Sequence, residues 1–193
     1  MFAAGGSGIM LPIIIVIIIV VVIILVLIGM YNSLVKLRNR VEEAFATMDV
    51  YMKKRFDLVP NLVETVKGYA SHESATLEKV VQARSMIQSA GTPEQRMQGE
   101  AALTTTLRSL FAVAEGYPEL KANTNFMGLQ TELSGIEDEI AQSRKYYNAI
   151  VRDYNTKTET FPSMLIANMF KFERKPSFEI ADDAERNAPK VQF

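Results

Sequence analysis

Residues 26–40 of the chain, VLIGMYNSLVKLRNR, pass from an apolar segment into alternating polar and charged residues. No proline and no cluster of turn-forming residues marks the change, and Gly29 is the only helix breaker at the boundary. One glycine inside a helix costs only about 1 kcal/mol relative to alanine. The need to pair every backbone group internally in an apolar solvent outweighs that cost. We therefore expect one helix to run from about Pro12 to about Phe56.

The segment before this boundary has the length and composition of a membrane span. Residues 9–28 are all apolar, and Pro12 lies near the start, where a helix tolerates it. About 20 residues, each rising 1.5 Å, cross a hydrocarbon core of roughly 30 Å. A cleaved signal would need a basic start, a shorter apolar run and a small-residue cleavage site, but residues 1–8 contain no Lys or Arg. We predict a retained transmembrane helix at 9–31, preceded by a tail at 1–8.

Basic residues flank this span on one side. Lys36, Arg38 and Arg40 follow it, whereas no Lys or Arg precedes it. Basic flanks remain on the cytoplasmic side of a membrane. We therefore expect the carboxy-terminal domain to lie in the cytoplasm and the amino terminus to lie outside.

The helical pattern continues beyond the span. Apolar residues recur at steps of three and four, which is typical of helices that pack on helices, at Leu34, Leu37, Val41, Phe45, Met48 and Met52. In RFDLVPNLVE, residues 55–64, Asp57 can cap a new helix that has Pro60 in its first turn. A kinked but continuous helix is the alternative. The same spacing then continues to Ala90, and Gly91 ends it.

Two further long helices and a short one follow. Thr92, Pro93 and Gln95 form a capping-box pattern, and EGYPE at 115–119 ends the helix that begins there. Residues 126–154 carry nearly unbroken heptads, and residues 162–170 predict a short apolar helix that folds back on the bundle. We predict an all-α fold: a long-helix antiparallel bundle of about four helices at 32–160, the short helix at 161–172 packed on it, and a polar tail at 173–193 that is mobile or ordered by a partner.

The composition excludes several classes of site. The chain of 193 residues has no Cys and a single His, His72, so disulfides, thiolate chemistry and multi-histidine metal sites are excluded. A net charge of −1 gives no reason to expect a nucleic-acid partner. We interpret His72 as a surface residue and the cluster Lys53, Lys54 and Arg55 as a solvated helix face. We expect no catalytic residue, no metal and no cofactor.

One repeat stands out from the helical background. Tyr147–Asn148 recurs seven residues later as Tyr154–Asn155, so both pairs lie on the same helical faces. Asn123 and Asn125 are crowded into the start of the same helix. One interpretation is that these Asn side chains cap and cross-link helices through hydrogen bonds. The other is a surface for a partner or for self-assembly.

Residues 117–155, YPELKANTNFMGLQTELSGIEDEIAQSRKYYNAIVRDYN, resemble the LemA family, and so do three stretches at 31–50, 53–73 and 161–172. The resemblance covers the chain from about Ile9 to Glu179. It implies a bacterial protein with one amino-terminal span, a cytoplasmic antiparallel bundle and no catalytic residues, among relatives associated with membrane organisation. It also implies that the patterned positions are determinants of folding or interaction: Tyr117, Pro118, Asn123, Phe126, Tyr147, Asn148, Tyr154 and Asn155.

Two functional hypotheses follow. The first is a non-enzymatic scaffold in the bacterial inner membrane that contacts lipid through its span, forms a homo-oligomer and presents a cytoplasmic bundle. The second is a membrane-tethered adaptor that recruits clients to a protease, chaperone or signalling complex through residues 161–172 and the tail. The sequence identifies no particular protein partner.

Overall fold

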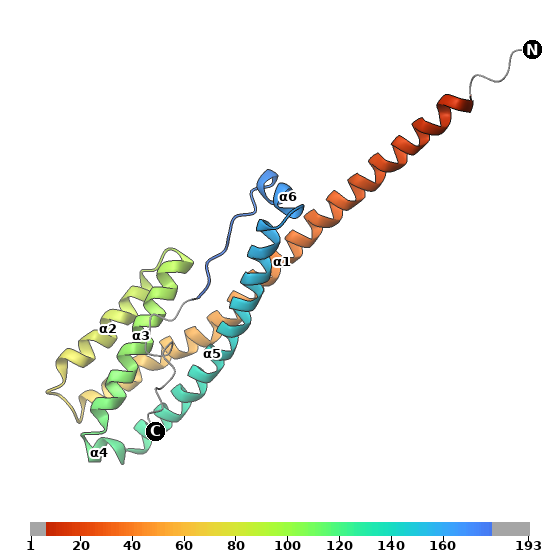
Figure 1. Cartoon of the computed structure of the whole chain (residues 1–193). Helices are drawn as coiled ribbons and strands as arrows, with labels where there is room; N and C mark the ends of the chain where they lie inside the picture. The colour runs from red at the N-terminus through yellow and green to blue at the C-terminus, as the bar shows by residue number, and fades with distance from the viewer. Residues whose placement is uncertain (1–6, 179–193) are drawn as a thin grey trace, which may run out of the picture. The chain divides into compact units, whose positions relative to one another are not determined.

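The structure is a computed structural model that describes residues 7–178. Residues 1–6 of the predicted tail at 1–8 and residues 179–193 of the predicted tail at 173–193 lie outside this range. The described part of the chain contains helices and connecting turns but no strand, which confirms the predicted all-α fold (Figure 1). The helices are α1 (Ser7–Lys67), α2 (Ser74–Gln88), α3 (Pro93–Ala114), α4 (Pro118–Lys121), α5 (Thr124–Glu159) and α6 (Ser163–Met169).

The chain folds into two compact units, and α1 and α5 each contribute to both. Unit 1 comprises residues Met1–Glu43 and Ala149–Lys175. Unit 2 comprises residues Ala44–Asn148 and Pro176–Phe193.

Helix α1 is uninterrupted over 61 residues and is, in the described part of the chain, the one helix long and apolar enough to cross a membrane. The large apolar side chains of residues 11–28 are between 42% and 65% exposed, so the rest of the chain does not cover them. The expected continuation of the apolar segment into the helix that follows it is therefore present.

The predicted end of this helix near Phe56 is wrong, and the continuous alternative is correct. Asp57 does not begin a new helix, because its carboxylate pairs with Lys53 one turn earlier, at 3.1 Å. Helix α1 accepts Pro60 in its interior, where a proline removes one backbone hydrogen bond. Val59 and Leu62 are completely buried on this part of the helix. Tertiary packing therefore outweighs the local preference for a break.

The first real break comes after Lys67, where the sequence pattern predicts continuous helix as far as Ala90. The backbone turns at Gly68–Glu73, where the amide of Tyr69 donates to the Val66 carbonyl at 3.0 Å and that of Ala70 at 2.8 Å. Ala70 is buried in this turn, so it keeps the apolar spacing through a segment that is not helical. The periodicity alone therefore concealed the break.

Unit 2 contains the larger hydrophobic core. Helices α2 and α3 form a hairpin in this unit (Figure 1). The core joins the end of α1 to α2, α3, α4 and the first half of α5 through Val59, Leu62, Val66, Ala70, Leu77, Val80, Ala83, Ile87, Leu103, Leu107, Leu110, Ala114, Leu120, Phe126 and Leu133.

The start of α3 follows its predicted cap. The Thr92 hydroxyl accepts a hydrogen bond from the Gln95 amide at 3.2 Å, and Pro93 occupies the first turn. The Gln95 side chain accepts from the amide of Gly91, at 2.9 Å, rather than from that of Thr92. The cap is therefore confirmed, with its reciprocal bond displaced by one residue.

Unit 1 joins the first part of α1 to the end of α5 and to α6, which lies beside α1 (Figure 1). Leu34, Val41 and Val151 are buried in this unit. Helix α6 appears where the sequence predicts a short helix, and its buried residues are Ser163, Ile166 and Ala167.

Gly99 gives a direct test of the α2–α3 contact. A Cβ atom at this position would lie 2.9 Å from Ile87 Cγ1 and 3.0 Å from the Ile87 backbone nitrogen. Gly99→Ala should therefore lower the free energy of unfolding by about 1–3 kcal/mol, because backbone has to move. Chemical denaturation in detergent, followed by far-ultraviolet circular dichroism, measures this change.

Gly128→Ala is the matched control, because Gly128 lies inside α5 with nothing within 4 Å of its added Cβ. This change should raise the free energy of unfolding by about 0.5–1 kcal/mol. Stabilisation by both alanines would refute the close approach of α3 to α2.

Candidate functional site

The most deeply buried charge in the structure is that of Arg55, on the part of α1 that belongs to unit 2. Its side chain is 1% exposed, and so is that of Glu100 on α3. The Arg55 Nη2 atom donates to Glu100 Oε2 at 2.5 Å and to the Glu100 carbonyl at 3.2 Å. An ion pair excluded from water needs such additional hydrogen bonds, because desolvation of the charges is costly.

The other guanidinium nitrogen of Arg55 links α3 to α5. Nη1 donates to the Thr104 hydroxyl at 2.7 Å and to the Glu137 carboxylate, which is 35% exposed. Arg55 therefore joins three helices of unit 2 through one planar group. The interpretation of Lys53, Lys54 and Arg55 as a solvated face is wrong for Arg55, while Lys53 and Lys54 are exposed.

Burial and the neighbouring cations have opposite effects on the Glu100 carboxylate. Burial raises the pKa of Glu100, while the adjacent Arg55 and the more distant Arg96 act in the opposite direction. Glu100 Oε1 accepts no hydrogen bond from the residues that the structure describes, and it lies 3.8 Å from Arg96 Nε. Arg96 itself pairs with Asp49 of α1 at 2.7 Å.

The positions of Arg55 and Glu100 in the sequence carry a signal for this network. Arg55 falls between Met52 and Val59, at steps of three and four along the buried face of α1. Glu100 takes the same kind of position between Met97 and Leu103 on α3. Two opposite charges at core positions of two helices indicate a buried pair.

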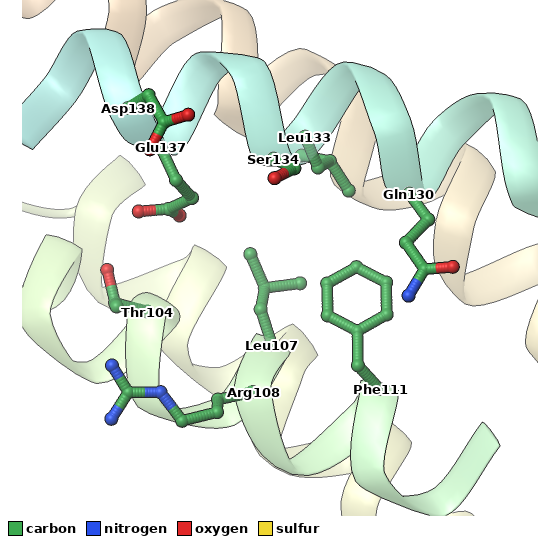
Figure 2. Close-up of a pocket in the computed structure, with 9 residues that line it drawn as sticks. All are labelled: Thr104, Leu107, Arg108, Phe111, Gln130, Leu133, Ser134, Glu137 and Asp138. Carbon is green, nitrogen blue, oxygen red and sulfur yellow. The ribbon is translucent and has the colours of Figure 1, made fainter. Parts of the chain in front are cut away.

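A cleft of about 360 Å³ lies between α3 and α5, next to this network (Figure 2). Figure 2 shows the Glu137 carboxylate and the Thr104 hydroxyl pointing toward one another. Leu107, Phe111 and Leu133 supply apolar lining, and the remaining lining residues are Arg108, Gln130, Ser134 and Asp138. Glu137 is one of the two carboxylates that line the cleft, and it also binds Arg55. The cleft therefore extends the Arg55 network to the surface.

The repeated Tyr–Asn pairs hold a non-helical segment, residues 173–178, through its backbone. In unit 2 the Asn148 amide donates to the Phe178 carbonyl at 3.0 Å, and its oxygen accepts from the Phe178 N–H at 2.8 Å. The Tyr147 hydroxyl donates to the Pro176 carbonyl at 2.9 Å. Burial, together with the charge of Glu94, raises the pKa of Tyr147 to about 12, so the hydroxyl keeps its proton at neutral pH.

The second pair repeats this arrangement in unit 1. The Asn155 amide donates to the Lys175 carbonyl and its oxygen accepts from the Lys175 N–H, both at 2.9 Å. The Tyr154 hydroxyl donates to the Glu173 carbonyl at 3.0 Å. Residues 173–178 begin the predicted tail, which was expected to be mobile or ordered by a partner, but in the structure α5 holds their backbone.

The spacing of the pairs matches the spacing of the peptide groups that they bind. Seven residues of helix rise about 10.5 Å, and three residues of extended chain advance about 10 Å. Each Asn pairs with both backbone groups of one residue, as a residue of a neighbouring antiparallel strand does. We call these four side chains, Tyr147, Asn148, Tyr154 and Asn155, the Tyr–Asn ladder.

The other four predicted positions lie at the α3–α5 end of unit 2. The Asn123 oxygen accepts from the Phe126 amide at 3.0 Å and so caps α5, and its nitrogen donates to the Tyr69 hydroxyl at 2.9 Å. Tyr117 donates to Glu73 at 3.2 Å, and burial and this bond raise the pKa of Tyr117. Pro118 begins α4.

Phe126 is buried against Phe111, with ring centroids 6.2 Å apart. Asn123, Asn148 and Asn155 therefore cap and cross-link within the chain. A partner surface built from these eight positions stays a prediction.

His72, the single histidine of the chain, is exposed. No group of three or more His, Asp or Glu side chains in the part of the chain that the structure describes is arranged to hold a metal.

Comparison with known proteins supplies the family. The family model described as the LemA family matches residues 44–193. The chain belongs to the LemA family. The match confirms the resemblance in the sequence and covers all of unit 2, including Arg55, Glu100 and Glu137.

Individual relatives of this LemA chain come from different bacteria. It is 26% identical to Protein LemA of Metamycoplasma hominis over 162 residues, which cover 83% of this chain and 74% of that protein. It is 25% identical to Magnetosome protein MamQ 2 of Paramagnetospirillum magneticum over 179 residues, covering 79% of this chain and 66% of the relative. It is 22% identical to Magnetosome protein MamQ of Magnetospirillum gryphiswaldense, with 79% and 65% covered.

Arg55→Met tests the buried network. The change leaves Glu100 buried without its cation, and we expect the free energy of unfolding to fall by about 3–5 kcal/mol at neutral pH. Burial raises the pKa of Glu100 and the charge of Arg55 lowers it, so removing Arg55 raises the folded-state pKa further than in the wild type, and the folded variant binds the proton more tightly. The deficit relative to wild type should therefore shrink as the pH is lowered from 7 toward 4.5. Denaturant titrations in detergent at several pH values measure both effects.

Lys54→Met is the control for this change, because it removes a neighbouring cation that is exposed. It should change the free energy of unfolding by less than about 0.5 kcal/mol. Adding Glu100→Leu to Arg55→Met should restore much of the loss, because no buried charge remains unpaired. Equal effects of Arg55→Met and Lys54→Met would contradict the assignment.

Asn148→Asp and Asn155→Asp test the Tyr–Asn ladder. Aspartate keeps the acceptor for the backbone N–H but replaces the donor with an oxygen that repels the carbonyl of residue 178 or 175. Loss of a bond to a buried group costs about 1–3 kcal/mol, so hydrogen exchange at residues 173–178 should accelerate about tenfold or more. Exchange followed by mass spectrometry measures this, with exposed Asn125→Asp as the control that leaves the rate unchanged.

Proposed function

We propose that this LemA-family chain is a non-enzymatic scaffold that is anchored in the membrane by α1, self-associates, and presents its helical units to the cytoplasm. The observation that carries the proposal is the single helix of 61 residues that contains both the apolar segment and the first helix of unit 2. A rigid connection of this kind transmits the position and orientation of the anchor to the folded domain.

The exposure of the apolar segment supports the membrane anchor. Residues 11–28 show side chains to the solvent on every face of the helix. Such a surface is stable only in lipid or against other apolar chains. Lys36, Arg38 and Arg40 follow the segment and are all exposed, which supports a cytoplasmic position for the rest of the chain in the inner membrane.

The relatives support a role at membranes. Three of them carry the name magnetosome protein, and the alignments extend over 79% of this chain. The buried polar side chains Arg55, Glu100 and Asn155 are engaged in internal hydrogen bonds and ion pairs, which supports a structural role for them.

Self-association follows from anchoring. Confinement to a plane raises the effective concentration of protomers without any new contact. The apolar helices can pack laterally in the membrane, where close van der Waals contact drives association. The proposed oligomer is therefore an assembly of parallel α1 helices.

The mass of the full-length protein in native lipid discs tests the scaffold. Light scattering, with the contribution of lipid removed, should give a discrete multiple of the 21.6 kDa chain. A shortened chain that begins at Asn32, with its helicity checked by circular dichroism, should form an assembly of fewer protomers. This result would show that residues 1–31, which include the apolar segment of α1, build the assembly.

A monomer in both preparations would overturn the scaffold and favour the adaptor. In that case α1 serves as a tether, and the next experiment identifies proteins that bind the cytoplasmic part reproducibly. Equal oligomers with and without residues 1–31 would place self-association in the helical units instead of the span.

A further inference from the structure

Helix α6 and its flanking residues expose an apolar face that the fold leaves uncovered. The buried side of this helix consists of Ser163, Ile166 and Ala167. The opposite side is far more exposed than an apolar surface usually is in a water-soluble domain: Phe161 is 78% exposed, Met169 71%, and Leu165 and Phe170 each 54%. The sequence predicts that these residues pack away from water, yet the described chain provides nothing that covers them.

Aromatic contacts attach this face to α1 within unit 1. The Tyr31 ring meets the rings of Phe170 and Phe172 edge-on, with centroids 4.8 Å and 5.7 Å apart. Phe172 is 9% exposed, and the Arg38 guanidinium lies 5.5 Å from its ring centroid. The Ser163 hydroxyl donates to the Lys157 carbonyl at 2.6 Å and fixes the start of α6 on the end of α5.

These contacts set the height of α6 along α1. Tyr31 is three residues beyond Ile28, the last residue of the apolar segment, and therefore about 4.5 Å further along the helix. The headgroup region of a bilayer adds about 5–8 Å on each side of the hydrocarbon core. If α1 spans the membrane as proposed above, α6 lies at the depth of the lipid headgroups, where aromatic residues such as Tyr31 are favoured.

The charges next to this face are mostly positive. Lys36, Arg38 and Lys171 are exposed on α1 and just after α6. Arg174 pairs with Glu159 at 3.3 Å, and both side chains remain more than half exposed. Glu173 is the other carboxylate close in sequence, and its backbone carbonyl is bound by Tyr154. Exposed cations beside an apolar surface are the combination that binds anionic lipid.

We propose that Phe161 and α6 with Phe170 form a second membrane contact, which inserts into the headgroup boundary of the bilayer that α1 spans and prefers anionic phospholipid. This inference rests on the proposed span. A single helix leaves a protein free to tilt in any direction relative to the membrane normal, and a second contact to one side of that helix restricts the tilt.

The absence of Trp from the chain allows a direct test, because any introduced Trp is the only one. Leu165→Trp places the probe on the exposed face of α6 in the full-length protein. The protein is reconstituted in vesicles of equal parts phosphatidylcholine and phosphatidylglycerol, with or without bromine on the acyl chains near the headgroup. We expect blue-shifted emission and a loss of about half of the intensity in the brominated vesicles, as for a side chain at the headgroup boundary.

Two further single-Trp variants serve as controls for a side chain in water and for a side chain in the hydrocarbon core. Val50→Trp is the matched control, because Val50 is 55% exposed against 54% for Leu165 but lies about 33 Å beyond Ile28 along α1. Its emission should be that of a Trp in water, with no quenching. Val20→Trp reports on the span itself and should be quenched by bromine placed deep in the acyl chains.

The outcomes separate the two proposals. Lack of quenching at Val20→Trp overturns the span, and with it the basis of this inference. Quenching at Val20→Trp with none at Leu165→Trp overturns the second contact alone, and blue-shifted but unquenched emission at Leu165→Trp assigns the face to a protein instead. Met169→Trp repeats the test at a second exposed position. Equal quenching in pure phosphatidylcholine overturns the preference for anionic lipid.

Discussion

A peptide group in hydrocarbon has no water to bind, and each N–H or C=O left unpaired there costs several kcal/mol. An uninterrupted helix meets this requirement in the apolar segment, and α1 continues as one helix from Ser7 to Lys67. The apolar segment and the first helix of each unit are consequently parts of one element. Contacts made on its outer portion, such as those of Tyr31 with Phe170 and Phe172, acquire a defined height relative to the apolar segment.

The second constraint is the burial of charge within unit 2. Arg55 satisfies Glu100, Thr104 and Glu137 at once; Glu100 is buried, and Thr104 and Glu137 are partly exposed. Apolar side chains in the same positions would give a core of similar or greater stability, since desolvation offsets most of the attraction in a buried ion pair. Helices that pack through apolar side chains alone can shift along one another. A guanidinium that binds three partners on two other helices allows only one register between them. We therefore interpret the network as a determinant of specificity.

The predictable parts of the fold were those fixed by local chemistry. The apolar segment, the Thr92 cap and the heptads of α5 each depend on neighbouring residues, and the sequence predicts all three correctly. The end of α1 depends on packing: Pro60 favours a break, but burial of Val59 and Leu62 overrides it. The run of Lys53, Lys54 and Arg55 favours a solvated helix face, although the spacing of Arg55 from Met52 and Val59 indicates a core position. The partners of the Tyr–Asn ladder could not be predicted from the sequence pattern. Apolar periodicity indicates a helix, but it contains no information about residues 173–178, which are not helical and show no such repeat.

The Tyr–Asn ladder binds the backbone of residues 173–178, whereas the side chains of this segment are held unequally. Glu173 and Ser177 are exposed, but Phe178 is buried, and the Arg144 guanidinium lies 5.5 Å from its ring centroid. Chain length is not free, because an inserted or deleted residue between Lys175 and Phe178 would shift one Asn partner by about 3.3 Å relative to the other. Among homologous proteins, this segment should accordingly keep its length and an apolar residue at position 178, while exposed positions such as 173 and 177 vary.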